Sequence, residues 1–544
     1  MILTIRFLFL LQILVSTHVF SHLPSQEETE ENLKRLEILA EPHCFSIPEG
    51  GFVYFFHPGV KKWLEKPLNT EVIKEIRKEL SPHLQIPLTK EGFTAASTRR
   101  DEEDLDITNY SAVWVRDACW SYYGLKTYDP NAAKQLMLGL LDFYSNKKQI
   151  ERFLSVIENP SLANPALNVS AHMNVPLIRF SSRTLSHHQV KGKDQEWNHL
   201  QFDSHGLFLL ALSDALSSNI LQKNDLRTRY FEVLALFPAF FTEVHYAEKK
   251  DAGPWEEELL YNASSAGLIA SGQRRIIDVI ESNSYLKQAL ENALKSIEQK
   301  HPALINKIAS ALLPENIEQL YKSGIERVET NLQLGGEAPD LNGESINRRA
   351  DIALLFLCLL EHTPYHNQSE KIRELLNITL SLVGPYGVYR YHNDAYQTSN
   401  YWITYSSPSA IDGIPTPDLN FVKRFNKGYL PSLQPNDAQW FFDANFAEVY
   451  YHLSMLQSDP KIRAYYVKRG DIHLKRSLGQ FTGPNSIAAN GEKLKAWQLP
   501  ESINTVILET SGIHPMPSPI CPLNWAKAAF LMALHQAEKA HTAE

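Results

Sequence analysis

The sequence predicts a large all-α protein, and three observations lead to this prediction. Apolar residues recur at intervals of three and four along most of the chain after about residue 110, which is the spacing of helices that bury one face. Loops that contain Pro, Gly and Asn separate these stretches. The 544 residues are 44% hydrophobic and 21% charged, so the chain is an ordinary globular one and is long enough to bury a large core.

The periodic stretches predict helices of roughly three or four turns. They span residues 132–158, 205–222, 284–299, 347–362, 447–457 and 524–540. Alternation typical of strands is rare, and residues 51–56 and 385–391 are the best short candidates. Because no short-period repeat occurs, we do not expect a regular solenoid.

The amino terminus is typical of a secretory signal. In residues 1–21, Arg6 precedes a short apolar run, and Val19 and Ser21 are small enough for a cleavage site. The apolar run is too short for a standard transmembrane helix, although an uncleaved membrane anchor is the alternative interpretation. We therefore expect a signal peptide at 1–21, an amino-terminal extension at 22–85 and a single domain at 86–544.

Charge and cysteine content exclude several classes of protein. The net charge is −9, whereas a dedicated nucleic-acid binder normally carries a basic balance, so we expect no nucleic-acid partner. The four cysteines show no C-x-x-C spacing, which argues against zinc ribbons and iron–sulfur clusters. Cys358 lies in an apolar run and is expected to be a buried free thiol, while Cys44 and Cys521 stand in loop-like segments and could pair.

Aromatic, acidic, Arg and amide residues recur together near the expected helix starts. Flat aromatic rings stack on sugar rings, while Asp, Arg, Asn and Gln side chains bind hydroxyl groups. Loops of this kind, gathered at one end of a helical barrel, predict a sugar site. The clusters span residues 109–120, 195–206, 253–265, 384–396, 437–446 and 499–502 with 521–525.

Each cluster also has a purely structural interpretation. Arg116 and Asp117 could form a buried ion pair at a helix start, and Asp203 could be a helix cap. The acidic run after Trp255 could be the first turn of a helix, which the helix dipole favours. Six such explanations at once are less economical than one shared site.

From about residue 90 onward, the clusters resemble, in order, the motifs of the glucoamylase family of glycoside hydrolases (family 15). They also resemble the glucoamylase-like domains of phosphorylase kinase regulatory subunits. The segment NYSAVWVRD is similar to the family's first motif, aromatic-x-W-x-R-D, and EWNHLQFDSHG resembles the second. The resemblance implies an (α/α)6 double helical barrel with a blind pocket formed by its loops, preceded here by the amino-terminal extension.

The resemblance also implies a role for individual residues. Arg116 and Asp117 match the pair that grips the terminal glucose, Glu256 matches the catalytic acid, and Glu501 matches the catalytic base. Because the segment after Trp255 is two or three residues longer than the family pattern, Glu257 is the alternative acid. The other residues implied to bind substrate are Trp114, Trp197, Asp203, Trp255, Glu257, Arg390 and Trp440.

Two carboxyl groups suffice for this chemistry, so we expect no cofactor and no metal. One protonated carboxyl gives a proton to the leaving oxygen, and a second, ionised carboxyl activates water on the opposite face of the sugar. Burial near Trp255 and neighbouring carboxylates would raise the pKa of Glu256 and keep it protonated.

These inferences predict a secreted, monomeric, inverting exo-glucosidase with no stable membrane association after signal cleavage. Its substrates would be α-1,4-linked glucans such as starch, glycogen and maltooligosaccharides. Two alternatives remain at this point. One is a non-catalytic glucan-binding or regulatory protein, favoured by the long 402–436 segment, and the other is a hydrolase of trehalose, isomaltose or dextran.

Overall fold

The computed structural model describes residues 42–98, 110–164, 174–190, 193–194, 197–257, 259–339, 348–394, 396, 438–508 and 512–542. This part of the chain is mainly helical, as the sequence predicts. The predicted signal segment at 1–21 and the 402–436 segment lie outside the described residues.

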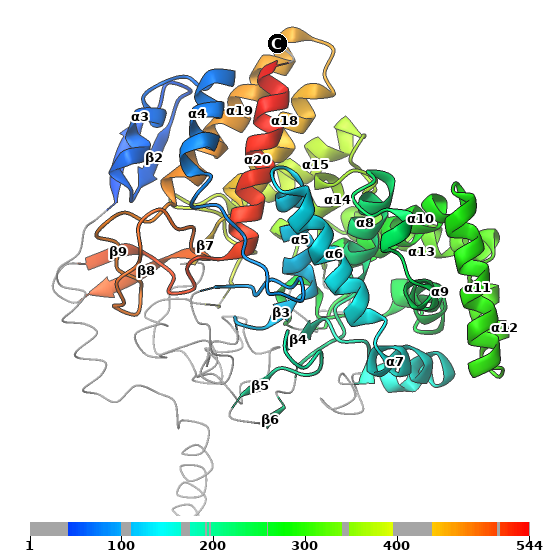
Figure 1. The fold of residues 1–544 in the computed structure, drawn as a ribbon. Coiled ribbons are helices and arrows are strands. Elements are labelled where there is room, and N and C mark those ends of the chain that lie inside the picture. Colours follow the sequence, from blue (N-terminus) through cyan, green and yellow to red (C-terminus); the bar gives the residue numbers. More distant parts are fainter. Residues whose placement is uncertain are drawn as a thin grey trace, which may run out of the picture.

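Six helical segments of the described chain form a closed inner ring in which each packs against the next. Around the ring they are α5 (Val115–Lys126), α8 (Phe202–Ser217), α10 (Ala263–Glu281), the short pair η8 (Ile352–Leu355) and α14 (Phe356–Leu359), α18 (Asp443–Met455) and α20 (Asn524–Thr542). Most of their residues are buried on every side, which is typical of helices surrounded by other helices. Helix α20, drawn in red in Figure 1, contacts both α5 and α18 and so closes the ring.

A second layer of helices surrounds this ring. It contains α4 (Thr70–Leu80), α6 (Pro130–Tyr144), α7 (Lys147–Glu158), α9 (Thr228–Glu243), α11 (Ser284–Lys300), α12 (Ile305–Ala311), α13 (Pro314–Gln333), α15 (Ser369–Thr379) and α19 (Pro460–Gly479). Outer helices pack on inner ones, as α6 does on α5, α13 on α10 and α19 on α18. The fold is therefore an (α/α)6 barrel, and the predicted fold class is confirmed.

Local sequence explains where several outer helices begin. The Asp129 carboxylate accepts a hydrogen bond from the Ala132 amide at 3.0 Å, and Pro130 follows as the first residue of α6. Asn146 caps α7 in the same way through the Gln149 amide at 3.0 Å. Such caps satisfy amides that have no partner inside the helix, and proline fits the first turn.

Two glycines allow α8 and α10 to touch through their backbones. A Cβ atom on Gly206 would lie 2.4 Å from the Leu268 carbonyl carbon, and one on Gly272 would lie 2.4 Å from the Gly206 carbonyl oxygen. Any side chain at either position would push the two inner helices apart. This close approach packs the start of α8, which carries Asp203 of the candidate site, against the middle of α10.

Short strands and 3₁₀ segments connect the helices. Figure 1 shows most of the strands at one end of the barrel. The strands are β1 (His43–Ser46), β2 (Phe52–Phe55), β3 (Val113–Trp114), β4 (Arg179–Phe180), β5 (Gln189–Val190), β6 (Lys193–Asp194), β7 (Gln439–Trp440), β8 (Ser502–Leu508) and β9 (Gly512–Pro517). The remaining short helices are η1 (Pro58–Val60), α3 (Lys61–Leu64), η3 (Pro160–Ala163), η5 (Lys223–Asp225), η6 (Tyr246–Glu248), η7 (Gly253–Trp255) and η9 (Leu380–Leu382). All strand pairs are antiparallel, and β7, β8 and β9 form one sheet in which Trp440 lies opposite Ser502.

Three predicted elements differ from the structure. The periodic stretch at 132–158 is divided into α6 and α7, because Asn146 caps a new helix start. The continuous helix expected at 347–362 is reduced to η8 and α14, because the chain turns extended at Leu360. The predicted strand at 385–391 makes only isolated bridges, among them Val388 to Trp440. The strand at Phe52–Phe55 is confirmed.

The described part of the predicted amino-terminal extension packs against the barrel. Helix α4 contacts α20, and strand β2 contacts α19. A buried ion pair fixes this packing, because Lys475 Nζ on α19 lies 2.6 Å from the Glu49 carboxylate and also donates to the Leu64 and Lys66 carbonyls. The division of the chain at residue 85 stays a prediction.

None of the four cysteines forms a disulfide, and Cys358 is buried as predicted. Cys44 is exposed and Cys521 is buried, and they are not joined. No helix among the described residues has the length and apolar character needed to cross a bilayer.

Replacing Lys475 with Met should destabilise the fold strongly. The substitution leaves the buried Glu49 carboxylate without its partner, and breaking a buried ion pair in this way costs about 3–5 kcal/mol. Urea-induced unfolding, followed by tryptophan fluorescence, measures the change in the free energy of unfolding.

The matched control is Lys61→Met. Lys61 pairs with Glu65 on the surface of the amino-terminal extension, the segment that also carries Glu49. An exposed pair contributes about 1 kcal/mol or less, so this variant should unfold close to the wild type. Equal stability of the two variants would contradict the anchoring role of Lys475.

Candidate active site

The first turns of the inner helices gather at one end of the barrel, and the loops between β strands and helices meet there. All eleven residues predicted for the site lie in one continuous network of contacts at this end. The links are hydrogen bonds, ring contacts and electrostatic interactions between neighbours. The structure thus brings the predicted residues together, while their individual roles stay predictions.

Arg116 lies at the centre of one half of this network. Its Nε atom donates to Asp203 Oδ2 at 2.5 Å, and its Nη1 atom donates to Glu256 Oε1 at 3.1 Å. Its Nη2 atom donates to the Gln201 side chain at 2.6 Å and to the Gly253 carbonyl at 3.2 Å. One guanidinium therefore joins the first turns of α5 and α8 to the loop that carries Glu256.

Asp117 follows Arg116 on the first turn of α5 and is buried. No side chain of the described residues hydrogen-bonds to its carboxylate, which leaves its oxygens able to accept hydrogen bonds from a ligand. Burial, opposed by Arg116 and helped by Glu256, raises the pKa of Asp117 to about 7. A buried carboxylate with open acceptor positions is suited to bind hydroxyl groups.

Glu256 has a backbone conformation that is rare for a side-chain-bearing residue. Its φ is +63°, in the left-handed region, at the end of η7. Such a conformation costs about 1–3 kcal/mol and is concentrated at functional sites. The Glu256 side chain keeps 14% of its surface exposed. Burial raises the pKa of its carboxyl, although the nearby Arg116 guanidinium acts in the opposite direction.

Glu257 has a different environment from its neighbour. Its side chain is 1% exposed, and its carboxylate contacts the guanidinium groups of Arg348 and Arg390 and the Tyr391 hydroxyl. These three groups occupy both of its oxygens. The predicted direct binding of sugar by Glu257 stays untested, and its contacts favour a role in fixing Arg390.

Arg390 joins this buried cluster to an aromatic wall. Its Nε and Nη2 atoms donate to Asp394 at 2.6 and 2.7 Å. Its guanidinium carbon lies 5.2 Å from the ring centroid of Trp255 and 4.9 Å from that of Trp440. The Trp255 indole donates to Asp351 at 3.0 Å, whereas the Trp440 indole N–H has no hydrogen-bond partner among the described residues.

Glu501 lies beside Trp440, because β7 and β8 pair at that point. The Tyr110 hydroxyl donates to Glu501 Oε1 at 2.6 Å and lies 2.7 Å from the Tyr396 hydroxyl. The Tyr396 ring in turn lies 5.8 Å from the Trp440 ring. Glu501 is buried, and the contacts through Tyr110, Tyr396 and Trp440 connect it to Trp255, the residue before Glu256.

Arg179 stacks between two of the predicted tryptophans. Its guanidinium carbon lies 4.1 Å from the ring centroid of Trp197 and 4.8 Å from that of Trp114, as strand β4 pairs with β3. Tyr110 packs against Trp114 with ring centroids 5.6 Å apart. These ring contacts connect the Glu501 side of the site to the Arg116 side. Arg179 also acts on the Arg116 side directly, because its positive charge lowers the pKa of Glu256.

Several residues that build the site were missed from the sequence. Asp251 is buried and accepts hydrogen bonds from the Phe202 amide at 2.9 Å, the Asn262 side chain at 2.9 Å and the Ser265 hydroxyl at 2.8 Å. It ties the two ends of the Glu256 loop to α8 and α10. Tyr110, Arg348, Asp394 and Tyr396 were not singled out either. Tyr110 stands inside the first motif, so its position four residues before Trp114 was an available signal.

Within the described ranges, no group of three or more His, Cys, Asp or Glu side chains is arranged to hold a metal ion. The site is built instead from carboxyl, guanidinium, phenol and indole groups. This set can bind hydroxyls, stack on a sugar ring and exchange protons.

The chain is similar to several known proteins. Residues 77–455 match the sequence model described as glycosyl hydrolases family 15. A segment of 137 residues is 37% identical to the uncharacterized lipoprotein YgeQ of Escherichia coli (strain K12). The matched segment makes up 24% of this chain and 51% of that protein, so the chain spans about half the length of this relative. The fold is similar to the Saccharomycopsis fibuligera glucoamylase (TM-score 0.49, 14% identity, 86% of this chain and 95% of that chain). It is also similar to the Hormoconis resinae glucoamylase (TM-score 0.48, 13% identity, 86% and 73%).

Glu257→Gln and Glu256→Gln should differ in their effect on stability. The first substitution removes the charge that neutralises Arg348 and Arg390, and breaking such a buried cluster costs about 3–5 kcal/mol. The second leaves Arg116 with Asp203, Gln201 and the Gly253 carbonyl, so a smaller loss is expected.

Urea-induced unfolding of both purified variants measures this difference. A Glu256→Gln protein that is the less stable of the two would contradict the assignment of Glu257 to the structural cluster.

Proposed function

Because the chain belongs to glycosyl hydrolases family 15, we propose that it is an exported, inverting exo-glucosidase that hydrolyses α-1,4-linked glucans. Starch, glycogen and maltooligosaccharides are its proposed substrates, and β-glucose is the proposed product. One observation carries the proposal. Two carboxyl groups from distant parts of the sequence lie on either side of one chain of aromatic contacts: Glu256 follows Trp255, and Glu501 accepts from Tyr110, while Trp440 and Tyr396 connect the two.

Glu256 is the proposed general acid. It donates a proton to the oxygen between the departing sugar and the terminal glucose. Burial supports this role because it raises the pKa of Glu256, and a raised pKa keeps the carboxyl protonated to higher pH. Turnover should fall as the pH rises through that pKa, since the acid then loses its proton.

Glu501 is the proposed general base. Its carboxylate removes a proton from a water molecule while that water attacks the anomeric carbon from the opposite face. The Tyr110 hydroxyl supports this role by donating a hydrogen bond to Glu501 Oε1 at 2.6 Å, which fixes the orientation of the carboxylate. Water, and not Glu501, forms the new bond to carbon, so the anomeric configuration inverts.

Arg116 and Asp117 are the proposed binding groups for the non-reducing terminal glucose. Their position on the first turn of α5, among Asp203 and Glu256, supports this role because charged groups already fixed in place bind hydroxyls at little entropic cost. The tryptophans Trp114, Trp197, Trp255 and Trp440 would stack on sugar rings. A site that grips a chain end releases one glucose at a time.

Glu256→Gln and Glu501→Gln should each lower kcat by about 10²–10⁴-fold, the range that general acid or base groups contribute. Glucose release from maltotriose by the purified variants measures the effect. Glu326→Gln is the matched control, because Glu326 is exposed on α13. Full activity of either test variant would remove that residue from the catalytic pair.

The anomer released first tests the inverting mechanism. Proton NMR of a fast maltotriose digestion should detect β-glucose before mutarotation. Inversion requires carboxyl groups about 6.5–9.5 Å apart, wide enough for a water molecule, whereas retention requires about 5 Å. Initial α-glucose would overturn the role of Glu501. Binding of maltooligosaccharides without any release of glucose would instead favour the non-catalytic alternative.

A further inference from the structure

A second pocket lies in the outer layer of helices, outside the predicted catalytic cluster. It has a volume of about 610 Å³ and is formed by the end of α9, by η6, by α12 and by the first half of α13. None of the eleven predicted site residues lines it. Its volume falls in the range of about 300–1,000 Å³ that small-molecule sites occupy.

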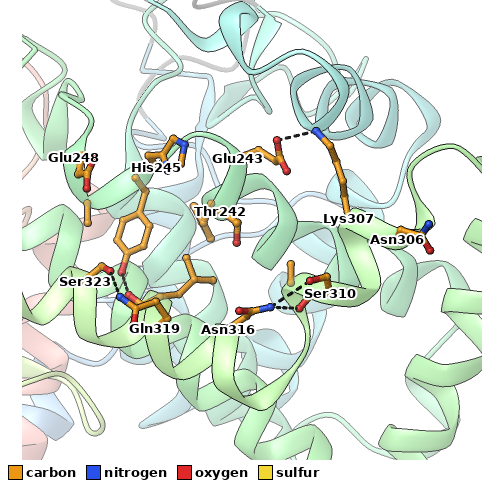
Figure 2. A pocket seen from close by; sticks show the side chains of 15 residues that line it. Thr242, Glu243, His245, Glu248, Asn306, Lys307, Ser310, Asn316, Gln319 and Ser323 are labelled. Carbon is orange, nitrogen blue, oxygen red and sulfur yellow. Dashed lines mark hydrogen bonds and ion pairs between the residues drawn. The ribbon is translucent and has the colours of Figure 1, made fainter.

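Uncharged polar side chains dominate the rim of this pocket. Figure 2 shows Asn316, Gln319 and Ser310 along one side, with His245, Glu243 and Lys307 along the other. Asn316 donates to the Ser310 carbonyl at 2.7 Å, and Gln319 donates to Ser323 at 3.2 Å, so the oxygens of both amides remain available as acceptors. The rim therefore offers both donors and acceptors in fixed positions.

The charges around the pocket exclude anionic ligands. Lys307 Nζ lies 2.8 Å from the Glu243 carboxylate and also donates to the Ile157 carbonyl, so its charge is neutralised. Glu248 also lines the pocket and forms no ion pair within the described part of the chain, so it adds a negative charge. An anion would meet repulsion here, whereas a neutral ligand with many hydroxyl groups would not.

The deeper side of the pocket is apolar and rigid. Phe241, Tyr246 and Leu320 contribute to it, and the Tyr246 hydroxyl donates to the Leu320 carbonyl at 2.7 Å. A second bond, from Arg327 to the Ala247 carbonyl at 2.7 Å, fixes η6 on α13. An apolar floor below a rim of amides and hydroxyls fits a sugar ring, which has an apolar C–H face and a polar edge.

We propose that this pocket is a second carbohydrate-binding site, which holds a glucose unit of an α-glucan chain apart from the catalytic centre. The choice of glucan as the ligand rests on the proposed function. The pocket and the proposed acid belong to one continuous segment, since Glu248 of the pocket precedes Glu256 by only eight residues. A polysaccharide bound at this site would raise the local concentration of chain ends near the catalytic pocket.

The test uses Gln319→Trp, which fills the pocket, with Lys322→Trp as its matched control. Both residues are exposed on α13, but only Gln319 lines the pocket. Asn316 is left intact because it caps the end of α12. Retardation of the purified full-length chain in native gels that contain glycogen measures polysaccharide binding, and glucose release from maltotriose measures catalysis.

Wild type and Lys322→Trp should be retarded equally, while Gln319→Trp should bind glycogen about tenfold more weakly, the effect of losing two neutral hydrogen bonds. Its maltotriose kcat/KM should stay unchanged. If Gln319→Trp does not fold, Asn306→Ala serves instead, because Asn306 is exposed on the same rim.

Two results would overturn the second site: equal glycogen retardation of wild type and the pocket variants, or no retardation of the wild type. Failure of the proposed function is a separate result. In that case the wild type would not cleave maltotriose, whether or not Gln319→Trp reduces its binding to glycogen.

Discussion

The site depends on one requirement, that the buried guanidinium of Arg116 be neutralised. A charge taken out of water is costly unless ionised and polar partners surround it. Asp203, Gln201, the Gly253 carbonyl and Glu256 meet this requirement, and they come from the start of α8 and from the loop before α10. Since these elements must meet to pair Arg116, the guanidinium fixes the relative position of three inner helices. The backbone contact between Gly206 on α8 and α10 is the steric counterpart of the same constraint.

The backbone conformation at Glu256 gives Glu256 and Glu257 different surroundings. The left-handed conformation of Glu256 turns the chain, so its side chain faces Arg116 while that of Glu257 faces Arg348 and Arg390. Both carboxylate oxygens of Glu257 are occupied by buried partners, Arg348 and Tyr391 on one and Arg390 on the other. Glu256 has one cationic contact and some exposed surface, so it retains the freedom to gain and lose a proton. The strain at Glu256 can persist because Asp251 holds both ends of its loop.

Much of this arrangement could be predicted from the sequence, because periodic apolar spacing and local motifs carry that information. Helices such as α6, α11 and α20 were predicted for this reason. The run at 347–362 misled the prediction, because an all-apolar stretch does not specify how long a buried helix continues. Strands β8 and β9 were missed, since their pairing with β7 joins segments far apart in the chain. Asp251 and Asp394 were missed for a related reason: only the fold buries these lone acids beside Asn262 and Arg390.

The balance of charge around the site explains why a protonated acid can exist there near neutral pH. The described neighbourhood holds more carboxyl groups than guanidinium groups, namely Asp117, Asp203, Asp251, Glu256, Glu257, Glu337, Asp351 and Asp394 against Arg116, Arg179, Arg348 and Arg390. Burial raises the pKa of Asp117 and of Asp251 to about 7 each, and neighbouring carboxylates act in the same direction. A carboxyl whose pKa is higher in the folded chain than its ordinary value of 3.8 stabilises the fold at low pH, and this contribution is lost as the pH rises toward 7. Burial of these carboxyl groups therefore has two effects. It lowers the stability of the fold at neutral pH, and it keeps carboxyl groups protonated to higher pH, which the proposed acid Glu256 requires.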